Sequence, residues 1–507
     1  MRVVLHRVES DCLKPIFEKE IPKEETCELV VPDVCADIGK ILDVRGQFLL
    51  TSQKSKTDEI HINASVEITV IYAADDSGKV QYVTASIPFD QAIPVEGANE
   101  NTKIATRCEL CTLDARTLNP RKLLLRAVTS MWISCYAPDV CIFWDNLSDG
   151  TEAPIHVLRK EVEHCLIIGI REKSFIVSDE YQLQKAKDQS AKMLCTNTEI
   201  CVEDAKSVGN KLIIKATANT TAIFLNESDG LLFDEMFSSQ FSQIIEVDTY
   251  GDSIDNTVII QLKDAEFTLI PGRENGYTVS AQLQVIAQAV CKENKNSVYV
   301  ADAYSNKCKL SAETAVTKIT KCMPEKYLKL SLRGKLQQNP SLGEIMYAAV
   351  STVCTEVDGN EIRCEINVSG VGVVENEELE PIELCLKDEE AVELTKGQGL
   401  YITDVCCEAP VIIGLPKNTE ISVDVNLGYR INEFMEVGAV SGLEMNEDCP
   451  AANENCPSLV VLCSDRDTDL WSLAKKYGST MEMIENANSL DGDFSITRRP
   501  LLIPRAH

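Results

Sequence analysis

An internal repeat of about 152 residues constrains the fold of this chain most, because the repeat length sets the size of the folding unit. The three copies start near Lys40, Lys192 and Glu344, and Tyr72 of copy one aligns with Phe224 of copy two without a gap. Such a repeat is too long for a solenoid and long enough for each copy to bury its own core. We therefore expect three modules in series.

Each copy carries the sequence pattern of β-strands. HINASVEITVIY (61–72) and KLIIKATANTTAIF (211–224) place apolar or β-branched residues at alternate positions, which is the period of a half-buried sheet. Turn-forming residues lie between such runs, at Asp76-Ser77-Gly78, Asp229-Gly230 and Asp358-Gly359. The sequence therefore predicts a mainly β fold in which each copy is an antiparallel sandwich or barrel-like module.

Composition and pattern together divide the chain into modules and connecting segments. Residues 442–457 read GLEMNEDCPAANENCP, an acidic, Asn-rich stretch with two prolines that is typical of a linker. We predict the following boundaries: an N-terminal leader at 1–24, β modules at 25–150, 172–304 and 325–441, the linker at 442–457, and a small domain at 458–507.

The last fifty residues follow a different pattern, strand, helix, helix, strand. Short apolar runs at 459–462 and 501–504 predict the two strands. Asp467-Thr468 is a candidate N-cap for LWSLAKKYG, which presents one apolar face and ends at Gly478. Ser479 and Glu482 fit a capping box that opens a second helix.

Charge and targeting signals exclude several functional classes. The formal net charge of −30 at pH 7 repels nucleic-acid backbones and anionic lipid, so we expect no nucleic-acid partner. The N-terminus MRVVLHRVES has no apolar signal region, and no apolar run is long enough to span a bilayer. We therefore expect a protein that is not secreted by a signal peptide and has no transmembrane segment.

The inventory of reactive side chains predicts neither catalysis nor a cofactor. The 21 cysteines are scattered, and only Cys108 and Cys111 form a CxxC pair, in a strand-like stretch where we expect one buried and one outward-facing thiol. Most cysteines are expected to be reduced and packed. The chain has five histidines and none of the common phosphate-loop, hydrolase, metalloprotease or kinase motifs. We predict a non-enzymatic protein without catalytic residues, metal or cofactor.

The C-terminal segment resembles a LysM domain through DTDLWSLAKKYGSTMEMIENAN and LLIP. Asp467 and Thr468 match the family's Asp-Thr loop, Trp471 its Leu-Trp-x-x-Ala helix, and Asn488 an asparagine after the second helix. Two loops depart from the family pattern: Arg466 replaces the loop glycine, and Arg498-Arg499-Pro500 replaces Pro-Gly-Gln. Because LysM domains hold N-acetylglucosamine oligomers in a groove between these loops, the arginines are expected to obstruct sugar binding.

This resemblance defines the candidate binding residues, each with a structural alternative. Trp471 is either a packed helix residue or a partner contact, and Asn488 is either a helix-terminating residue or a binding residue. The basic side chains form either a partner-binding surface or a solvated face. The full candidate set is Asp467, Thr468, Trp471, Lys475, Lys476, Asn488, Arg498 and Arg499.

The whole chain resembles SipL-type spore-coat proteins with SPOCS domains. The resemblance rests on the repeated β modules, the Asp37-Ile38-Gly39-Lys40 stretch, the VIY strand with its Asp-Gly turn, and the C-terminal LysM-like segment. It implies a protein made in the mother-cell cytoplasm and recruited to the forespore surface. There it would bind a coat morphogenetic ATPase through LysM, contact other coat proteins and help anchor the coat. The alternative is a peptidoglycan or cortex glycan-binding protein that uses LysM.

Overall fold

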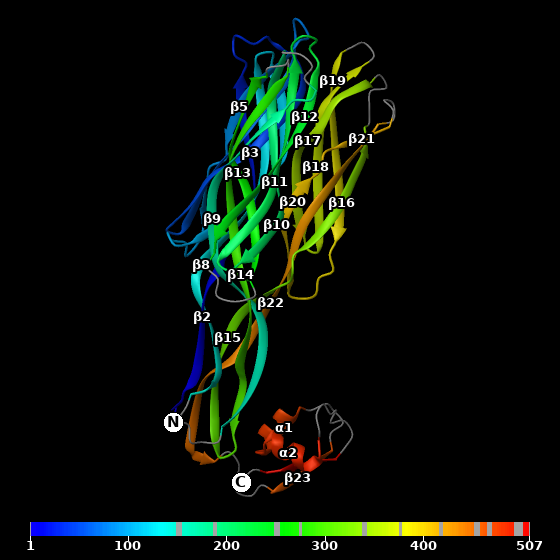
Figure 1. The fold of residues 1–507 in the computed structure, drawn as a ribbon. Helices are drawn as coiled ribbons and strands as arrows, with labels where there is room; N and C mark the ends of the chain where they lie inside the picture. The colour runs from blue at the N-terminus through cyan, green and yellow to red at the C-terminus, as the bar shows by residue number, and fades with distance from the viewer. Residues whose placement is uncertain are drawn as a thin grey trace.

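A computed structural model provides the fold, and strands make up most of it (Figure 1). Among the described residues only two short helices occur, so the prediction of a mainly β fold is confirmed. No described helix has the length and apolar character needed to cross a membrane. The structure describes residues 2–148, 155–185, 190–247, 254–272, 276–336, 342–374, 378–414, 419–450, 457–463, 469–490 and 500–505.

Three small antiparallel sheets, one from each copy, have the same strand order. Each sheet consists of consecutive strands joined by tight turns, and the short strand β6 (Gln91–Pro94) adds to the sheet of copy one. The strands are β3 (Ile38–Lys56), β4 (Glu59–Ala74) and β5 (Val80–Pro88); β10 (Ala191–Val208), β11 (Lys211–Asn226) and β12 (Leu232–Glu246); β17 (Leu342–Asp358), β18 (Glu361–Val374) and β19 (Leu379–Ala391).

The burial pattern of β4 explains why its sequence changes character along the strand. From Ile60 to Ile68 every second side chain is buried, as expected for a strand with one face on a core. From Thr69 to Tyr72 all side chains are buried. The second face is covered there because Ile71 packs against the other two copies. The continuous apolar run ITVIY is therefore the sequence signature of a strand buried on both faces.

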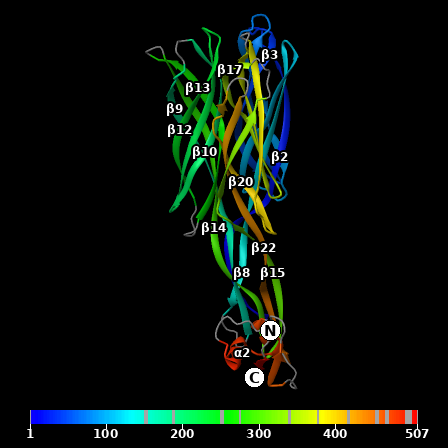
Figure 2. The same ribbon diagram turned by 90° about the vertical axis from the view of Figure 1, so that its right-hand side faces the viewer.

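The remaining strands of the repeats belong to one twelve-stranded sheet (Figures 1 and 2). In each copy the last long strand pairs with strands that come before and after the small sheet in the sequence. β8 pairs with β2 and β7, and β14 pairs with β9 and β13. In copy three, β22 pairs with β15 and β16 before the small sheet and with β20 and β21 after it. The strands are β1 (Arg2–Val3), β2 (Leu5–Val30), β7 (Lys103–Asn119), β8 (Lys122–Leu147), β9 (Ile155–Gln182), β13 (Ile254–Pro271), β14 (Tyr277–Ser305), β15 (Cys308–Cys322), β16 (Lys326–Lys335), β20 (Gln398–Cys407), β21 (Val411–Ile413) and β22 (Glu420–Pro450).

Each small sheet shares an apolar core with the long strands of its own copy. In copy one Val66 of β4 and Leu125 of β8 belong to one buried cluster. Ile214 and Val285 belong to the corresponding cluster of copy two, and copy three has its own cluster around Ile366. Full burial of one such side chain stabilises the folded chain by about 1.5–3 kcal/mol.

The three copies close into a ring instead of standing in series. β3 of copy one contacts β13 of copy two, β10 of copy two contacts β20 of copy three, and β17 of copy three contacts β7 of copy one. The small sheets also share one buried apolar cluster on the axis of the ring, made of Leu42, Ile71, Val80, Leu194, Ile223, Leu232, Tyr347 and Val371. The expectation of modules in series is therefore wrong for their arrangement in space, because each copy buries further apolar surface against the other two.

Below the ring the long strands continue as a stalk of three antiparallel ribbons, β2 with β8, β9 with β14, and β15 with β22 (Figure 1). Its small core includes Leu5, Val300 and Leu443, one from each ribbon. Two predicted boundaries are corrected here. Residues 1–24 are not a separate leader, since β2 begins at Leu5, and the predicted linker starts too early, since β22 runs to Pro450.

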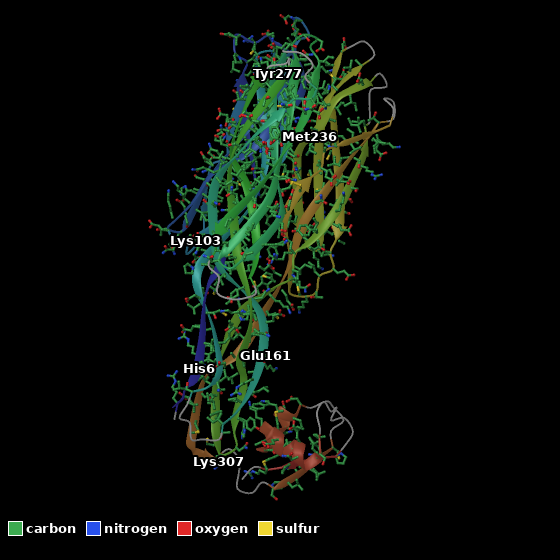
Figure 3. The ribbon with its side chains drawn as sticks, viewed as in Figure 1. His6, Lys103, Glu161, Met236, Tyr277 and Lys307 are labelled. Carbon is green, nitrogen blue, oxygen red and sulfur yellow. A yellow bond between two sulfur atoms is a disulfide. The ribbon has the colours of Figure 1, made fainter. Side chains whose placement is uncertain are left out.

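The sequence pattern did not predict the stalk strands, because most of their side chains face water. In β2 nearly all side chains are exposed or half-buried, so the strand lacks a clear apolar face. Its position is fixed by the backbone hydrogen bonds of the ladder to β8, which extends from Leu5 to Val30. Figure 3 labels His6 of β2 and Lys307, which lies between β14 and β15, at the foot of this stalk.

The C-terminal unit, residues 457–505, packs two helices against a two-stranded sheet. Its elements are β23 (Leu459–Cys463), α1 (Leu470–Tyr477), α2 (Met481–Asn488) and β24 (Pro500–Pro504). The strands pair antiparallel, with Leu459 opposite Pro504. Gly478 ends α1 with φ of 67°, a left-handed conformation that glycine adopts without strain.

Both helices begin at the residues that the sequence predicted, Leu470 and Met481, but their N-caps differ from the predicted ones. The N-cap of α1 is Asp469, whose side chain accepts a hydrogen bond from the backbone N–H of Ser472. The N-cap of α2 is Thr480, which accepts from Met483, so the predicted capping box at Ser479 is wrong. In each case a neighbouring residue with an equally suitable side-chain oxygen takes the capping position.

Candidate functional site

Four of the eight predicted binding residues lie in the part of the C-terminal unit that the structure describes. Trp471, Lys475, Lys476 and Asn488 are described there. The other four, Asp467, Thr468, Arg498 and Arg499, lie outside the described residues. The structure therefore places the helix side of the predicted site.

Trp471 and Lys475 both contact the foot of the stalk. The indole Nε1 of Trp471 donates a hydrogen bond of 2.8 Å to Asp302 of β14, and the Lys475 ammonium lies 2.7 Å from both oxygens of the same carboxylate. Burial disfavours the charged form of Asp302, but the hydrogen bonds from Lys475 and Trp471 outweigh it and lower its pKa. These two residues are thus engaged within the chain.

An aromatic contact reinforces this docking. The ring of Tyr304 meets Trp471 edge to face, with centroids 4.8 Å apart, and its hydroxyl donates to the backbone oxygen of Ser479 at 2.9 Å. Trp471 is 9% exposed and belongs to the same buried cluster as Tyr304. Of the two interpretations of Trp471, the packed helix residue is the one that the structure supports.

Asn488 joins α2 to β24. Its amide nitrogen donates to the backbone oxygens of Ile484 and Leu502, and its side-chain oxygen accepts from the Leu502 N–H at 2.8 Å. These bonds engage both ends of the amide in holding the fold together. Lys476 remains exposed, with its ammonium 5.3 Å from the ring centroid of Tyr477. Among the four described candidates, Lys476 is therefore the one that stands open to a partner.

A polar cavity of about 220 Å³ lies between the three copies and was not predicted from the sequence. Corresponding strands of all copies line it, and Met236, labelled in Figure 3, lies at its wall. The lining segments are 46–48, 107–110, 197–200, 260–262, 350–353, 404–405 and 407–410.

Four carboxylates, of Glu109, Glu199, Asp404 and Glu408, and the Arg107 guanidinium give this cavity its charge. Burial raises the pKa of Glu199 to about 8, although the Cys407 N–H donates to this carboxylate at 3.1 Å. Burial also raises the pKa of Asp404 to about 6. Glu109 instead pairs with Arg107 and accepts two hydrogen bonds from Thr355. The cavity thus holds two ion-paired carboxylates, Glu109 with Arg107 and Glu408 with Lys329, and two carboxylates whose pKa is raised by burial.

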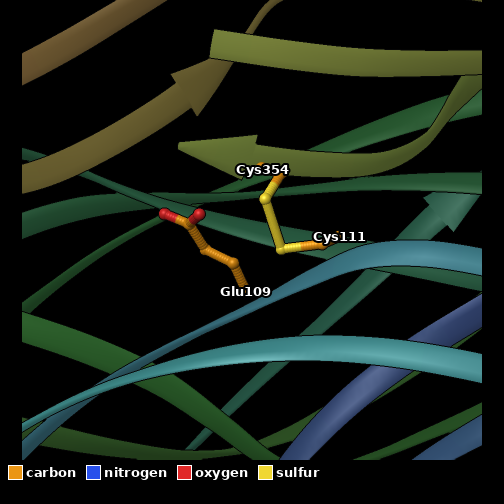
Figure 4. Close-up of side chains that lie close together, drawn as sticks. All are labelled: Glu109, Cys111 and Cys354. Atoms are coloured by element: carbon orange, nitrogen blue, oxygen red, sulfur yellow. A yellow bond between two sulfur atoms is a disulfide. The ribbon is translucent and has the colours of Figure 1, made fainter. Parts of the chain in front are cut away.

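In the part of the chain that the structure describes, two groups of side chains at contacts between copies have the composition of metal ligands. Glu109, Cys111 and Cys354 meet where copy one contacts copy three (Figure 4). Glu199, Cys201 and Cys406 meet where copy two contacts copy three. In this structure the cysteines of each group form a disulfide that joins two copies.

The disulfides correct the expectation for the CxxC pair. Cys111 is buried and bonded to Cys354, and Cys108 is half-buried against the core of copy one. The sequence predicted that one of the two thiols faces outward, and the structure shows that neither does. A short signal was available in the sequence, because Glu109-Leu110-Cys111 and Glu199-Ile200-Cys201 both read Glu-x-Cys. The partner cysteines lie 243 and 205 residues further along the chain, where no local pattern identifies them.

A buried ionic network connects copies one and three on the ring axis. Arg45 binds Asp43 through a 2.7 Å contact and donates to the backbone oxygens of Val350 and Ser369. Asp43 also accepts from the Tyr347 hydroxyl at 2.8 Å. These hydrogen bonds satisfy the polar atoms of Asp43 and Arg45, whose side chains are almost completely buried.

A comparison with family models finds a match in copy one. None of the curated proteins compared with the chain matches it. Residues 37–117, which run from the start of β3 to near the end of β7, match the family model described as SipL, SPOCS domain. This match supports the SipL-type resemblance for that segment and with it a link to sporulation.

Proposed function

We propose that this protein is a non-enzymatic structural adaptor of bacterial endospore coat assembly. The observation that carries the proposal is the SipL, SPOCS domain match at residues 37–117. In this proposal all three copies are SPOCS-type sandwich modules and the C-terminal unit is a LysM domain. The protein acts in the mother-cell cytoplasm at the forespore surface, where it binds a coat morphogenetic ATPase and anchors the coat.

The arrangement of the C-terminal unit supports a protein partner more than a glycan. The Asn488 amide is engaged by the backbone of Ile484 and Leu502, and the Trp471 indole by Asp302. Neither polar group is therefore free to bind a sugar hydroxyl. Lys476 offers an exposed cation in a chain with a net charge of −30, which suits an acidic protein surface.

A parallel binding experiment tests the proposal with the full chain. Tagged protein is incubated with lysate of sporulating cells and, separately, sedimented with purified peptidoglycan. We expect mass spectrometry to identify a coat ATPase in the lysate sample and no enrichment on peptidoglycan. Lys476→Glu should weaken ATPase capture, because it reverses the exposed charge, whereas Lys318→Glu on the stalk, where the lysine side chain is 80% exposed, should not.

The opposite pattern contradicts the adaptor role. In that pattern the protein sediments with peptidoglycan, added N-acetylglucosamine oligomers abolish this sedimentation, and no ATPase is captured. This result would establish the glycan-binding alternative. Equal effects of the two lysine substitutions would show that α1 is not the binding surface.

A further inference from the structure

The two Glu-Cys-Cys groups share a geometry that suits a thiophilic metal ion. In each group a Glu and a Cys two residues apart on one strand meet a Cys from the neighbouring copy, and the three ligand atoms lie within 4.8 Å of one another. Thiolate and carboxylate ligands at such separations are typical of Zn²⁺ sites. Among the described residues, the contact between copies one and two has no such group, because Gln47 and Leu49 occupy the positions of Glu199 and Cys201 in copy one.

We propose that Glu199, Cys201 and Cys406 form a binding site for a thiophilic divalent cation such as Zn²⁺ when the two cysteines are reduced. Two thiol groups of an external reductant supply two electrons and two protons and become a disulfide themselves, which converts the Cys201–Cys406 disulfide to two thiols. Binding of the cation then forms two metal–sulfur bonds and one metal–oxygen bond, and the two thiols and any protonated Glu199 carboxyl release their protons to the solvent. Water completes the tetrahedral coordination.

The backbone leaves room for this coordination. The Cα atoms of Cys201 and Cys406 are 5.6 Å apart. Two thiolates on a tetrahedral Zn²⁺ stand about 3.8 Å apart, given Zn–S bonds of about 2.3 Å. Rotation of the two side chains at fixed backbone positions can bring the sulfurs to this separation. The cation would thus join copies two and three, as the disulfide does in this structure.

The surroundings of the two carboxylates make the Glu199 group a better metal site than the Glu109 group. Both oxygens of Glu109 are occupied, by Thr355 at 2.7 and 2.8 Å and by the Arg107 guanidinium. The arginine charge also opposes a bound cation. Glu199 accepts one hydrogen bond, from the Cys407 N–H, and among the described residues no Lys or Arg side chain pairs with it. Its second oxygen is therefore open to a metal.

Zinc titration of the reduced full-length protein tests the site, with the Glu109 group as internal control. Metal-free protein is kept in a phosphine reductant, and Zn²⁺ binding is measured by competition with a chromophoric chelator. We expect one tight equivalent for the wild type. Cys406→Ser should abolish it and Glu199→Gln should weaken it at least tenfold. Cys354→Ser, which removes the matching thiol of the other group, should retain it.

A second readout separates the site from the remaining cysteines. Co²⁺ in place of Zn²⁺ should give a thiolate-to-metal absorption band that is lost in Cys406→Ser and kept in Cys354→Ser, while circular dichroism checks that both variants fold. The proposal is overturned if the wild type binds no tight equivalent. It is equally overturned if Cys354→Ser loses the equivalent, or if Cys406→Ser keeps it.

Discussion

Replacement of Arg45 by Met tests whether the ring axis is held by the buried ion pair. Arg45 is 3% exposed and Asp43 4% exposed, so neither charge is hydrated in the folded protein. Met keeps most of the unbranched stem of Arg45 and removes its charge and hydrogen-bond donors. The Asp43 carboxylate then stays buried without its cation, and the backbone oxygens of Val350 and Ser369 lose their donor.

The expected loss of folding free energy follows from the remaining contacts of Asp43. Removing one partner of a buried ion pair costs about 3–5 kcal/mol. Here the Tyr347 hydroxyl, the Ser369 hydroxyl and the Val44 N–H still donate to the carboxylate at 2.6–2.8 Å. We therefore expect the lower end, about 3 kcal/mol. In an Asp43→Asn background, Arg45→Met leaves no uncompensated carboxylate. There the same replacement of Arg45 should lower the free energy of unfolding by only about 1–2 kcal/mol.

A double-mutant cycle measures this difference. Urea unfolding of the wild type, Arg45→Met, Asp43→Asn and the double variant should give a coupling energy of at least about 1 kcal/mol. Arg7→Met, which removes a half-exposed arginine paired with Glu9 on the stalk, serves as control and should cost less than about 0.5 kcal/mol. Additivity within about 0.5 kcal/mol, or a neutral Arg45→Met, would refute the buried pair as a link between copies one and three.

Two further predictions concern a glycine and a histidine. Gly370→Ala should cost about 3 kcal/mol or more in urea unfolding, because the new Cβ would overlap the backbone oxygen of Tyr347, whereas Gly169→Ala, with no atom within 4 Å of its Cβ, should be nearly neutral. Burial lowers the pKa of His164 from 6.5 to about 4, so the folded state binds fewer protons than the unfolded state and stability falls as the pH drops below about 6.5. Between pH 8 and pH 5 the wild type should lose about 1–2 kcal/mol more than His164→Gln; equal losses would contradict the burial of a neutral imidazole.

The sequence predicted the strands of the ring well because their burial follows a regular period. Alternation along β4 marks the face on the core, and the turn glycines mark the hairpins, with Gly230 at φ of 74° between β11 and β12. The stalk was missed because strands such as β2 are held mainly by backbone hydrogen bonds, which leave no trace in side-chain hydrophobicity. Whether a segment is a leader or a strand then depends on its partner, which sequence pattern does not reveal.

The candidate sites show the same limit for contacts between distant parts of the chain. Trp471 was recognised as a helix residue with two alternative roles, but its partner Asp302 lies 169 residues earlier in an ordinary strand. The bond between Cys201 and Cys406 likewise joins positions 205 residues apart. Such pairings follow from the closure of the ring and the docking of the C-terminal unit. They become predictable only once the arrangement of the copies is known.

Closure of the ring within one chain also lets the copies carry different residues where they meet. A register shift in β3, β10 and β17 brings Asp43, Cys195 and Tyr347 to equivalent positions near the axis. Three identical subunits would place three copies of one residue there, and three buried carboxylates would repel one another. A single chain can instead set the Tyr347 hydroxyl 2.8 Å from Asp43, with Arg45 to balance the charge. Exchange of one copy for another would therefore break the network even if each copy folded correctly.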